Sequence, residues 1–225
     1  YVSAGGWHTA IIKNDDSLWM CGLAQAGRLG NGEDGSVSQA TPVKIMTNVA
    51  SVSSGAWHTA ILKKDGSLWM CGSGENGKLG DGTTTSKATP VKIMTDVKKV
   101  YCGRKNTAII KKDNSLWVCG LNNYGQIGDG TTTNRYTPVK VMTGVKDASI
   151  GGYFTGALKN DGTVWTWGIN TDGELGDGTI TNRTKPIKVA SDVASLSIGH
   201  SHSAIVKKDG SLWTWGYNEY GEIGN

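Results

Sequence analysis

The sequence is informative first in what it contains little of. Only four prolines accompany 33 glycines, which excludes a Pro/Gly-rich low-complexity or collagen-like chain. No apolar run approaches the roughly 18–20 residues that span a bilayer, and no charged segment followed by an apolar one opens the chain as in a signal peptide. Charged residues make up 19% and the net charge is +4, which is too mild to indicate a nucleic-acid partner.

What the sequence does contain is an internal repeat with a period of about 48 residues. Tryptophans recur with this period, apart from a slightly longer first interval, at Trp19, Trp69, Trp117, Trp165 and Trp213. All four prolines keep the same period, at Pro42, Pro90, Pro138 and Pro186. So does the first glycine of each unit, at Gly5, Gly55, Gly103, Gly151 and Gly199. We therefore divide the chain into repeat units at roughly 1–48, 49–96, 97–144, 145–192 and 193–225, within a single repeat domain.

Each unit has the pattern of about four short strands. In the second unit, two β-rich runs flank Asp65-Gly66, which predicts a hairpin whose type I′ turn has positive φ at both residues. Pro90 opens the last run of the unit and predicts a strand start or an edge strand. No segment sustains a 3.6-residue apolar period, so helices are not expected. Four strands in each unit of this length favour an all-β fold, a β-propeller of four-stranded blades, over a β-solenoid with shorter rungs.

The residues of the unit support a family resemblance. The segments GAWHTA (55–60), KDGSLW (64–69), GKLGDG (77–82) and PV (90–91) resemble the regulator of chromosome condensation repeat. The fifth unit matches through His202, Asp209-Gly210, Trp213 and Trp215. The resemblance covers the whole chain and implies a propeller, usually of seven blades, with no catalytic chemistry in the repeat itself. The family includes guanine-nucleotide exchange factors, chromatin-bound proteins, ubiquitin-ligase modules and secreted bacterial proteins, among them an inhibitor of β-lactamases.

The length corresponds to about 4.7 units, whereas a ring of seven blades would need roughly 340 residues. The chain starts just before one first-glycine segment and stops where other units continue toward the proline strand. We interpret it as a fragment, an open arc of four to five blades from a longer ring. A closed ring of five blades is the alternative.

Cysteine and histidine positions are explained by packing. Cys21, Cys71 and Cys119 occupy the position that holds Trp167 and Trp215 in the last two units, which indicates a packing position and not a disulfide framework. The equivalent residues of another position are His8, His58, Asn106, Phe154 and His202. The Asn and Phe break any ring of metal ligands, so we expect structural imidazoles that bond backbone near the glycine turn. We expect no metal, no cofactor and no small-molecule substrate.

The candidate binding residues are those at which the units differ. After the first glycine of each unit the chain carries varied residues, among them the Trp, Tyr and Arg that are enriched in interface hot spots. Our candidate partner-binding set is Trp7, Trp57, Arg104, Lys105, Tyr153, Phe154 and His200. A second variable stretch contains Tyr124, Tyr217 and Tyr220. The equivalent turns should lie on one rim of the propeller. The alternative is that Trp7, Trp57 and Tyr153 are ordinary blade-packing residues.

These features favour a non-enzymatic module that binds a protein partner through one loop face. The simple, nearly identical units resemble bacterial members of the family, which suggests part of a larger secreted or surface protein, with a cytoplasmic location as the alternative. Our second hypothesis is an exchange factor for a small GTPase. The exchanger of the family uses a wedge within one blade, whereas here the units differ in length only by two added residues near Glu33. No recurring acid/base pair supports a hydrolase or lyase.

Overall fold

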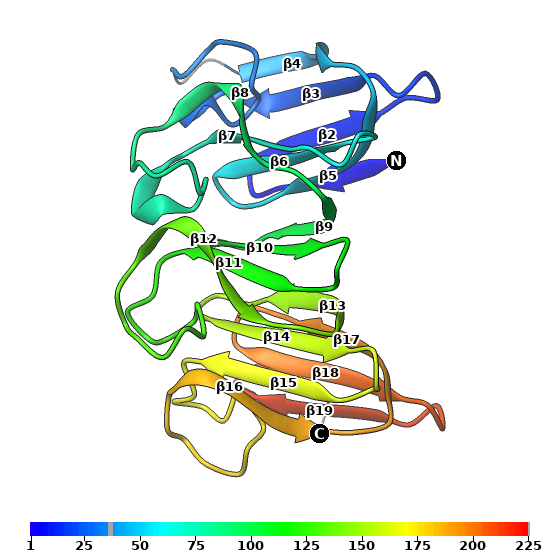
Figure 1. The fold of residues 1–225 in the computed structure, drawn as a ribbon, viewed down its shortest axis with the longest axis vertical. Helices are drawn as coiled ribbons and strands as arrows, with labels where there is room; N and C mark the ends of the chain where they lie inside the picture. The colour runs from blue at the N-terminus through cyan, green and yellow to red at the C-terminus, as the bar shows by residue number, and fades with distance from the viewer. Residues whose placement is uncertain (36–37, 225) are drawn as a thin grey trace.

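A computed structural model describes residues 1–35 and 38–224 (Figure 1). Five separate antiparallel sheets contain their strands in chain order, four strands in each of the first four sheets and three in the fifth. The innermost strands are β1 (Val2–Ala4), β5 (Val49–Ser54), β9 (Val97–Cys102), β13 (Val145–Ile150) and β17 (Val193–Ile198). The second strands are β2 (His8–Ile12), β6 (His58–Lys63), β10 (Asn106–Lys111), β14 (Phe154–Lys159) and β18 (His202–Lys207).

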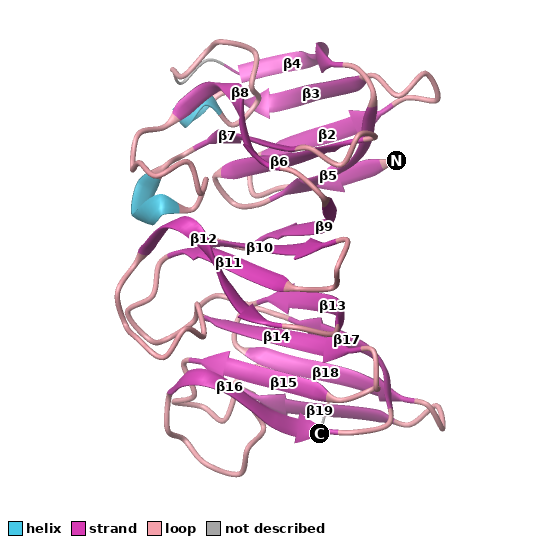
Figure 2. Ribbon diagram, in the orientation of Figure 1, coloured by secondary structure: helices cyan, strands magenta, loops and turns pink. Residues whose placement is uncertain are grey.

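The outer strands complete each sheet. The third strands are β3 (Leu18–Leu23), β7 (Leu68–Gly72), β11 (Leu116–Gly120), β15 (Val164–Gly168) and β19 (Leu212–Gly216). The fourth strands are β4 (Ser38–Met46), β8 (Lys87–Met94), β12 (Arg135–Met142) and β16 (Arg183–Ala190). Two 3₁₀ turns, η1 (Gln25–Gly27) and η2 (Glu75–Gly77), are the helical segments of the described residues (Figure 2), a small departure from the expectation of none.

The sheets follow one another as the blades of a fan, from the N-terminal blade at the top of Figure 1 to the C-terminal blade at the bottom. The innermost strands of consecutive blades lie next to each other, and Gly6 N–H donates to the Gly55 carbonyl at 3.1 Å. No strand of the first sheet pairs with one of the fifth in the described chain. The prediction of an all-β propeller with four-stranded blades, about 4.7 of them, is confirmed.

The core lies between consecutive blades. One cluster joins Leu18 and Met20 of the first blade to Val52 and Ile61 of the second, and similar clusters fill the following interfaces. Because each blade buries its apolar residues against its neighbours, the blades stabilise one another as in other repeat proteins.

The hairpin turns differ from the predicted type. Gly66 has φ +84°, but Asp65 does not have a positive φ. Gly66 N–H donates to the Lys63 carbonyl, and Lys63 N–H donates to the Ser67 carbonyl at 2.9 Å, so the loop has three residues and ends in a bulge glycine. The Asp65 carboxylate favours this three-residue loop over a two-residue turn, because it accepts hydrogen bonds from both the N–H and the hydroxyl of Ser67. The Ser67 hydroxyl in turn accepts from the indole of Trp69 at 3.0 Å.

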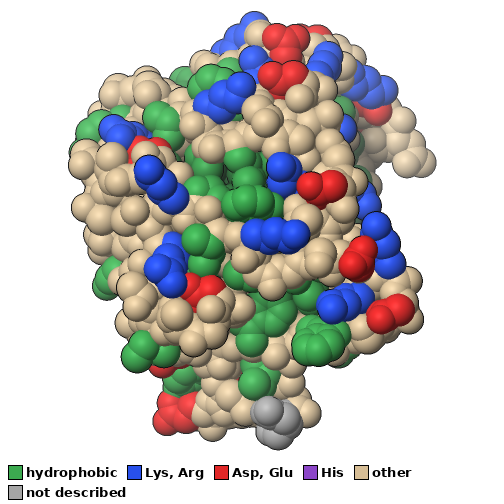
Figure 3. Space-filling model, turned by 60° about the horizontal axis from the view of Figure 1, so that its bottom comes forward, with side chains coloured by type: hydrophobic (Ala, Val, Ile, Leu, Met, Phe, Trp, Pro, Cys, Tyr) green, Lys and Arg blue, Asp and Glu red, His purple; other side chains and the backbone are tan. Residues whose placement is uncertain are grey.

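The outermost strands carry the prolines, which confirms that they belong to edge strands. On these strands a lysine lies opposite the repeated tryptophan, as Lys92 does opposite Trp69. Figure 3 shows lysine and arginine side chains interspersed with carboxylates on the face it presents. None of the helical segments in the described chain is long and apolar enough to cross a membrane.

Gly72 allows the loop before β6 to approach the end of β7. Its φ is +108°, and a Cβ there would lie 2.7 Å from the Trp57 carbonyl oxygen. We expect Gly72→Ala to lower the free energy of unfolding by about 2–3 kcal/mol or more, from backbone strain and overlap together. Gly178 has φ +77° with no atom within 4 Å of the added Cβ. Gly178→Ala should therefore lower the free energy of unfolding less, by the backbone strain alone. Urea denaturation checks this, and equal losses in both variants would contradict the close approach.

Candidate functional site

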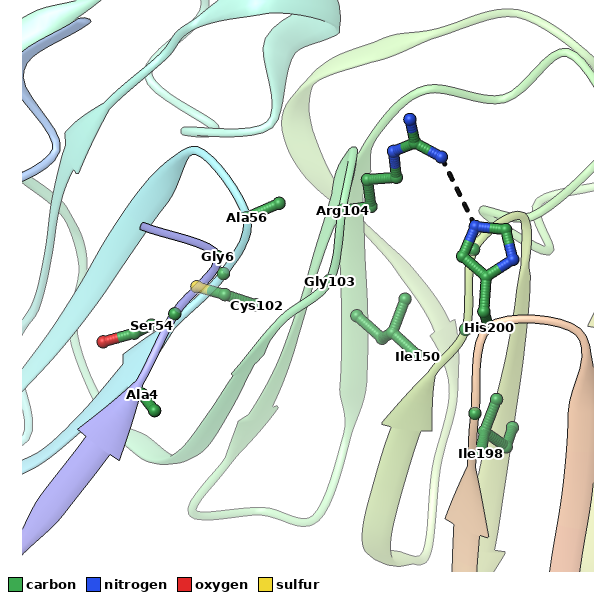
Figure 4. A pocket seen from close by; sticks show the side chains of 15 residues that line it. Ala4, Gly6, Ser54, Ala56, Cys102, Gly103, Arg104, Ile150, Ile198 and His200 are labelled. Carbon is green, nitrogen blue, oxygen red and sulfur yellow. Dashed lines mark hydrogen bonds between the residues drawn. The ribbon is translucent and has the colours of Figure 1, made fainter. Parts of the chain in front are cut away.

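The turns after the first glycine of each unit meet at one end of the fan. Ser54, Gly103 and Ile150 help to line an open pocket of about 380 Å³ there, and residues of all five blades contribute to it (Figure 4). We call the surrounding surface the rim and define it by residues 5–7, 55–57, 103–105, 151–153 and 199–201, together with the glycine-rich loop of the preceding blade that each turn contacts. The hairpin turns lie at the opposite ends of the second strands.

Three variable residues from three different blades come together on the rim. Arg104 is exposed and its guanidinium donates to His200 Nε2 at 3.3 Å, as drawn in Figure 4. His200 Nδ1 therefore carries the proton and donates to the hydroxyl of Ser201 at 3.0 Å. The Tyr153 ring meets the His200 ring edge to face at 6.4 Å and the Tyr124 ring at 5.5 Å. Such pairs contribute about 0.5–1.5 kcal/mol each, so this cluster is preorganised.

The two tryptophans of the candidate set remain accessible. Trp7 is 64% exposed and Trp57 is 37% exposed. The Trp57 ring stacks on the guanidinium of Arg28, with the ring centroid 4.5 Å from Cζ. Lys105 occupies the equivalent position in the third blade and is half-buried. Two of the positions after the rim glycines thus pack on the glycine-rich loop of the preceding blade, Trp57 on Arg28 and Tyr153 on Tyr124.

The prediction that Phe154 belongs to the partner-binding set has to be corrected. It is fully buried, and its ring lies against Gly151, where an added Cβ would meet it at 2.5 Å. It occupies the position of His8, His58 and Asn106, which are buried beneath the rim. The side chain therefore packs the blade and offers no surface to a partner. The other six candidates keep surface or partial exposure.

The buried histidines bond differently from the expectation of local backbone bonds. His8 Nε2 lies 2.8 Å from the hydroxyl of Thr59 in the next blade, and His58 Nε2 lies 2.9 Å from that of Thr107. Thr59 already donates its proton to the Arg28 carbonyl at 2.8 Å, so His8 must donate through Nε2. Its Nδ1 is left as an acceptor without a hydrogen-bond partner among the described residues, as is that of His58.

Both imidazoles are consequently neutral. Burial, reinforced by the positive charge of Arg28, lowers the pKa of His8 to about 4. Burial, reinforced by the positive charge of Lys78, lowers the pKa of His58 to about 3. These histidines join neighbouring blades through hydrogen bonds, and protonation would place an uncompensated charge in the interface.

Arg28 is a residue that the sequence reasoning missed. Its side chain is fully buried, Nε donates to the Gln25 carbonyl at 2.8 Å, and Nη1 and Nη2 have no hydrogen-bond partner among the described residues. Burial lowers its pKa. The sequence did contain a signal for this position, because its charge differs from unit to unit. The residues equivalent to Arg28 are Lys78, Gln126, Glu174 and Glu222.

The rim thus offers aromatic rings, a guanidinium and imidazole hydrogen-bonding groups, all suited to recognising a protein surface. In residues 1–35 and 38–224 no three His, Cys, Asp or Glu side chains lie close enough to hold a metal ion. Fold and site together define a repeat-built β-propeller with a variable rim.

The whole chain, residues 1–225, matches the family model of the RCC1-like domain, and the protein belongs to that family. The suspected resemblance to the regulator of chromosome condensation repeat is therefore confirmed. No curated protein sequence matches the chain.

Solved structures show the same fold. Human WBSCR16 superimposes with a TM-score of 0.84 at 21% identity, over 96% of this chain and 61% of that one. Yeast RCC1 (Prp20), in a structure with Kap60 bound, gives a TM-score of 0.77 at 19% identity over 99% of this chain and 71% of that one. Prp20p from Saccharomyces cerevisiae, described with its binding properties to Gsp1p and histones, gives 0.74 at 20% identity over 99% and 73%. The chain thus spans about three fifths of the length of WBSCR16.

Proposed function

We propose that this domain is a non-catalytic module that binds a protein partner through the rim. The observation that carries the proposal is that the most variable positions of the repeat converge there, with Arg104, Tyr153 and His200 in one contacting cluster. A role in the framework alone would favour the same residue in every unit, as at the first glycines and the repeated tryptophans. Varied aromatic and basic residues on a preorganised surface suit a specific protein contact.

The relatives support a protein partner. Yeast RCC1 (Prp20) has been solved with Kap60 bound, and Prp20p is described with its binding to Gsp1p and histones. Because a propeller fold can host many functions, the residues of the rim, and not the fold, indicate the binding face and the kind of partner. On this account the domain is not an exchange factor, and it should not accelerate nucleotide release from a panel of small GTPases.

The test removes the two exposed tryptophans of the rim. Trp7→Ala combined with Trp57→Ala should weaken binding to the native partner by at least 10- to 100-fold, as expected when about 1.4–2.8 kcal/mol of hot-spot energy is lost. Calorimetry or surface plasmon resonance measures the affinity, and circular dichroism checks folding.

The matched control removes two large hydrophobics away from the rim. Leu212 and Trp213 begin β19 beside the hairpin turn, at the end of the blade opposite the rim, and are 67% and 54% exposed. Leu212→Ala combined with Trp213→Ala should leave the affinity unchanged. Full affinity in the folded tryptophan variant, or an equal loss in the control, would refute the rim.

A further inference from the structure

The guanidinium of Arg28 is removed from water, and no carboxylate of the described residues pairs with it. The side chain is fully buried, and only Nε is hydrogen-bonded within the described residues, to the Gln25 carbonyl. Guanidinium remains protonated in proteins, so Nη1 and Nη2 carry charge and N–H donors with no acceptor. A buried unpaired charge is costly, and such a group calls for an acceptor beyond the described residues.

The side chains equivalent to Arg28 in the next three blades have hydrogen-bond or ion-pair partners within their own loops. Lys78, also fully buried, donates to the Ser73 hydroxyl at 3.0 Å and lies 3.5 Å from the Glu75 carboxylate. Gln126 bonds to Asn123 and to the Tyr124 N–H. Glu174 accepts from the Asp172 N–H at 2.9 Å. The counterpart of Glu75 in the first unit is Gln25, which is neutral, and Arg28 forms no ion pair with an Asp or Glu of the described residues.

The cover over Arg28 is an exposed aromatic ring. Trp57 stacks on the guanidinium, and its own ring is more than one-third exposed to solvent. Its indole N–H has no hydrogen-bond partner among the described residues, whereas the indole of Trp69 donates to Ser67. Stacking on Arg28 is thus the contact that holds Trp57, and a ligand that reaches Nη1 and Nη2 must displace the ring. Because Nε already donates to the Gln25 carbonyl, Nη1 and Nη2 are the nitrogens for which a ligand would supply an acceptor.

We propose that Arg28 and Trp57 form a carboxylate-binding site, in which an Asp or Glu side chain of the protein partner pairs with Nη1 and Nη2 while Trp57 packs against its methylene groups. A carboxylate matches the two parallel N–H donors of the guanidinium edge. The proposal rests on the rim as the binding surface and adds the chemistry that the partner must present there.

The site can be tested without the partner by using acetate as the probe. In the ¹⁵N-labelled protein, replacing chloride by acetate at constant ionic strength should shift the Trp57 indole and Arg28 Nε resonances with saturation. Arg28→Gln introduces the residue of the third unit and should abolish the shift at Trp57. Lys78→Gln, the matched control, should leave it intact. A shift at Trp57 that is linear in acetate, or one that persists in Arg28→Gln, would overturn the site.

Stability gives a second readout. Because Arg28→Gln removes an unpaired buried charge, it should raise the melting temperature in the absence of acetate by about 2–4 °C. Lys78→Gln breaks contacts that are satisfied and should lower it. A lower melting temperature in Arg28→Gln would show that the guanidinium serves the fold and would overturn the proposal.

The partner assay separates this proposal from the one it rests on. Arg28→Gln should weaken the partner about 10- to 100-fold, the effect of one lost charge-assisted pair. If Arg28→Gln binds normally while Trp7→Ala with Trp57→Ala does not, the carboxylate site fails and the rim stands. If both variants bind normally, both proposals fail.

Discussion

Lowering the pH from 7 to 4.5 should destabilise the propeller by about 2–3 kcal/mol for each of His8 and His58. The pKa of His8 is lowered to about 4 and that of His58 to about 3 in the folded protein. An unfolded histidine has a pKa near 6.5, so below that pH the unfolded chain binds more protons than the folded one. The free energy of unfolding therefore falls as the pH drops from about 6.5 toward 4. Urea denaturation at a series of pH values measures the slope.

The lowered carboxylate pKa values act in a different range. Hydrogen bonds to Thr179 and Arg183 outweigh burial and lower the pKa of Asp177 to about 2. Its stabilisation is complete above the unfolded pKa near 4 and is lost only as the pH falls toward 2. Stability lost between pH 6.5 and 4.5 is thus assigned to the buried histidines.

A double substitution isolates this effect. Asn106 occupies the equivalent position in the third blade and donates to the Leu121 carbonyl at 2.6 Å without a titrating group. His8→Asn combined with His58→Asn should flatten the profile between pH 6.5 and 4.5. The exposed His200→Asn is the control and should keep the wild-type slope. An unchanged slope in the double variant would show that other groups control the acid response.

Trp167→Ala should lower the free energy of unfolding by about 3–5 kcal/mol, the range for truncating a large buried aromatic. Trp167 is the largest fully buried side chain of the described residues. Its indole donates to the Gln126 carbonyl of the preceding blade at 3.0 Å, and the variant leaves this acceptor without its donor. The loss therefore falls on the interface between the third and fourth blades. Chemical denaturation measures it.

Two comparisons test the cause of that loss. Trp213 belongs to the third strand of the fifth blade and is 54% exposed, so Trp213→Ala should cost much less. Trp167→Cys introduces the residue of the second and third blades, where Cys71 and Cys119 are buried with Sγ near the equivalent carbonyls at 3.6 and 3.7 Å. Because the surrounding residues have not changed to fill the cavity, Trp167→Cys should also be destabilised. Equal losses in Trp167→Ala and Trp213→Ala would contradict the buried interface.

The sequence was sufficient for the architecture because the repeat multiplies each weak local signal. One Asp-Gly pair is ambiguous, but the same pair placed between two β-rich runs in several units fixes the hairpin, and the period fixes the blade. The turn type was predicted wrongly, because the Asp65 side chain accepts two bonds from Ser67 and stabilises a three-residue loop. Local propensity alone did not contain this bond.

The rim was predictable only in part. Variation between units located Arg104, Tyr153 and His200, which the structure brings together from three blades. Variation did not distinguish surface from interior, and Phe154 was therefore misplaced. Arg28 lacks an ion-pair partner in the described residues because Gln25 stands where the second blade has Glu75, and it is covered by Trp57 from the next blade. Such relations between blades are visible only in three dimensions.

The central claim, that the partner binds at the rim, is tested most directly by site-specific photo-crosslinking in the organism that encodes the protein. A photoreactive residue replaces Ala56 or Tyr153 on the rim, or Lys64 or Asn160 in the hairpin turns at the opposite ends of the same strands. We expect the rim positions to capture one protein, and Trp7→Ala with Trp57→Ala to abolish its capture, while the hairpin positions capture none. Capture of that protein from the hairpin positions and not from the rim would contradict the account.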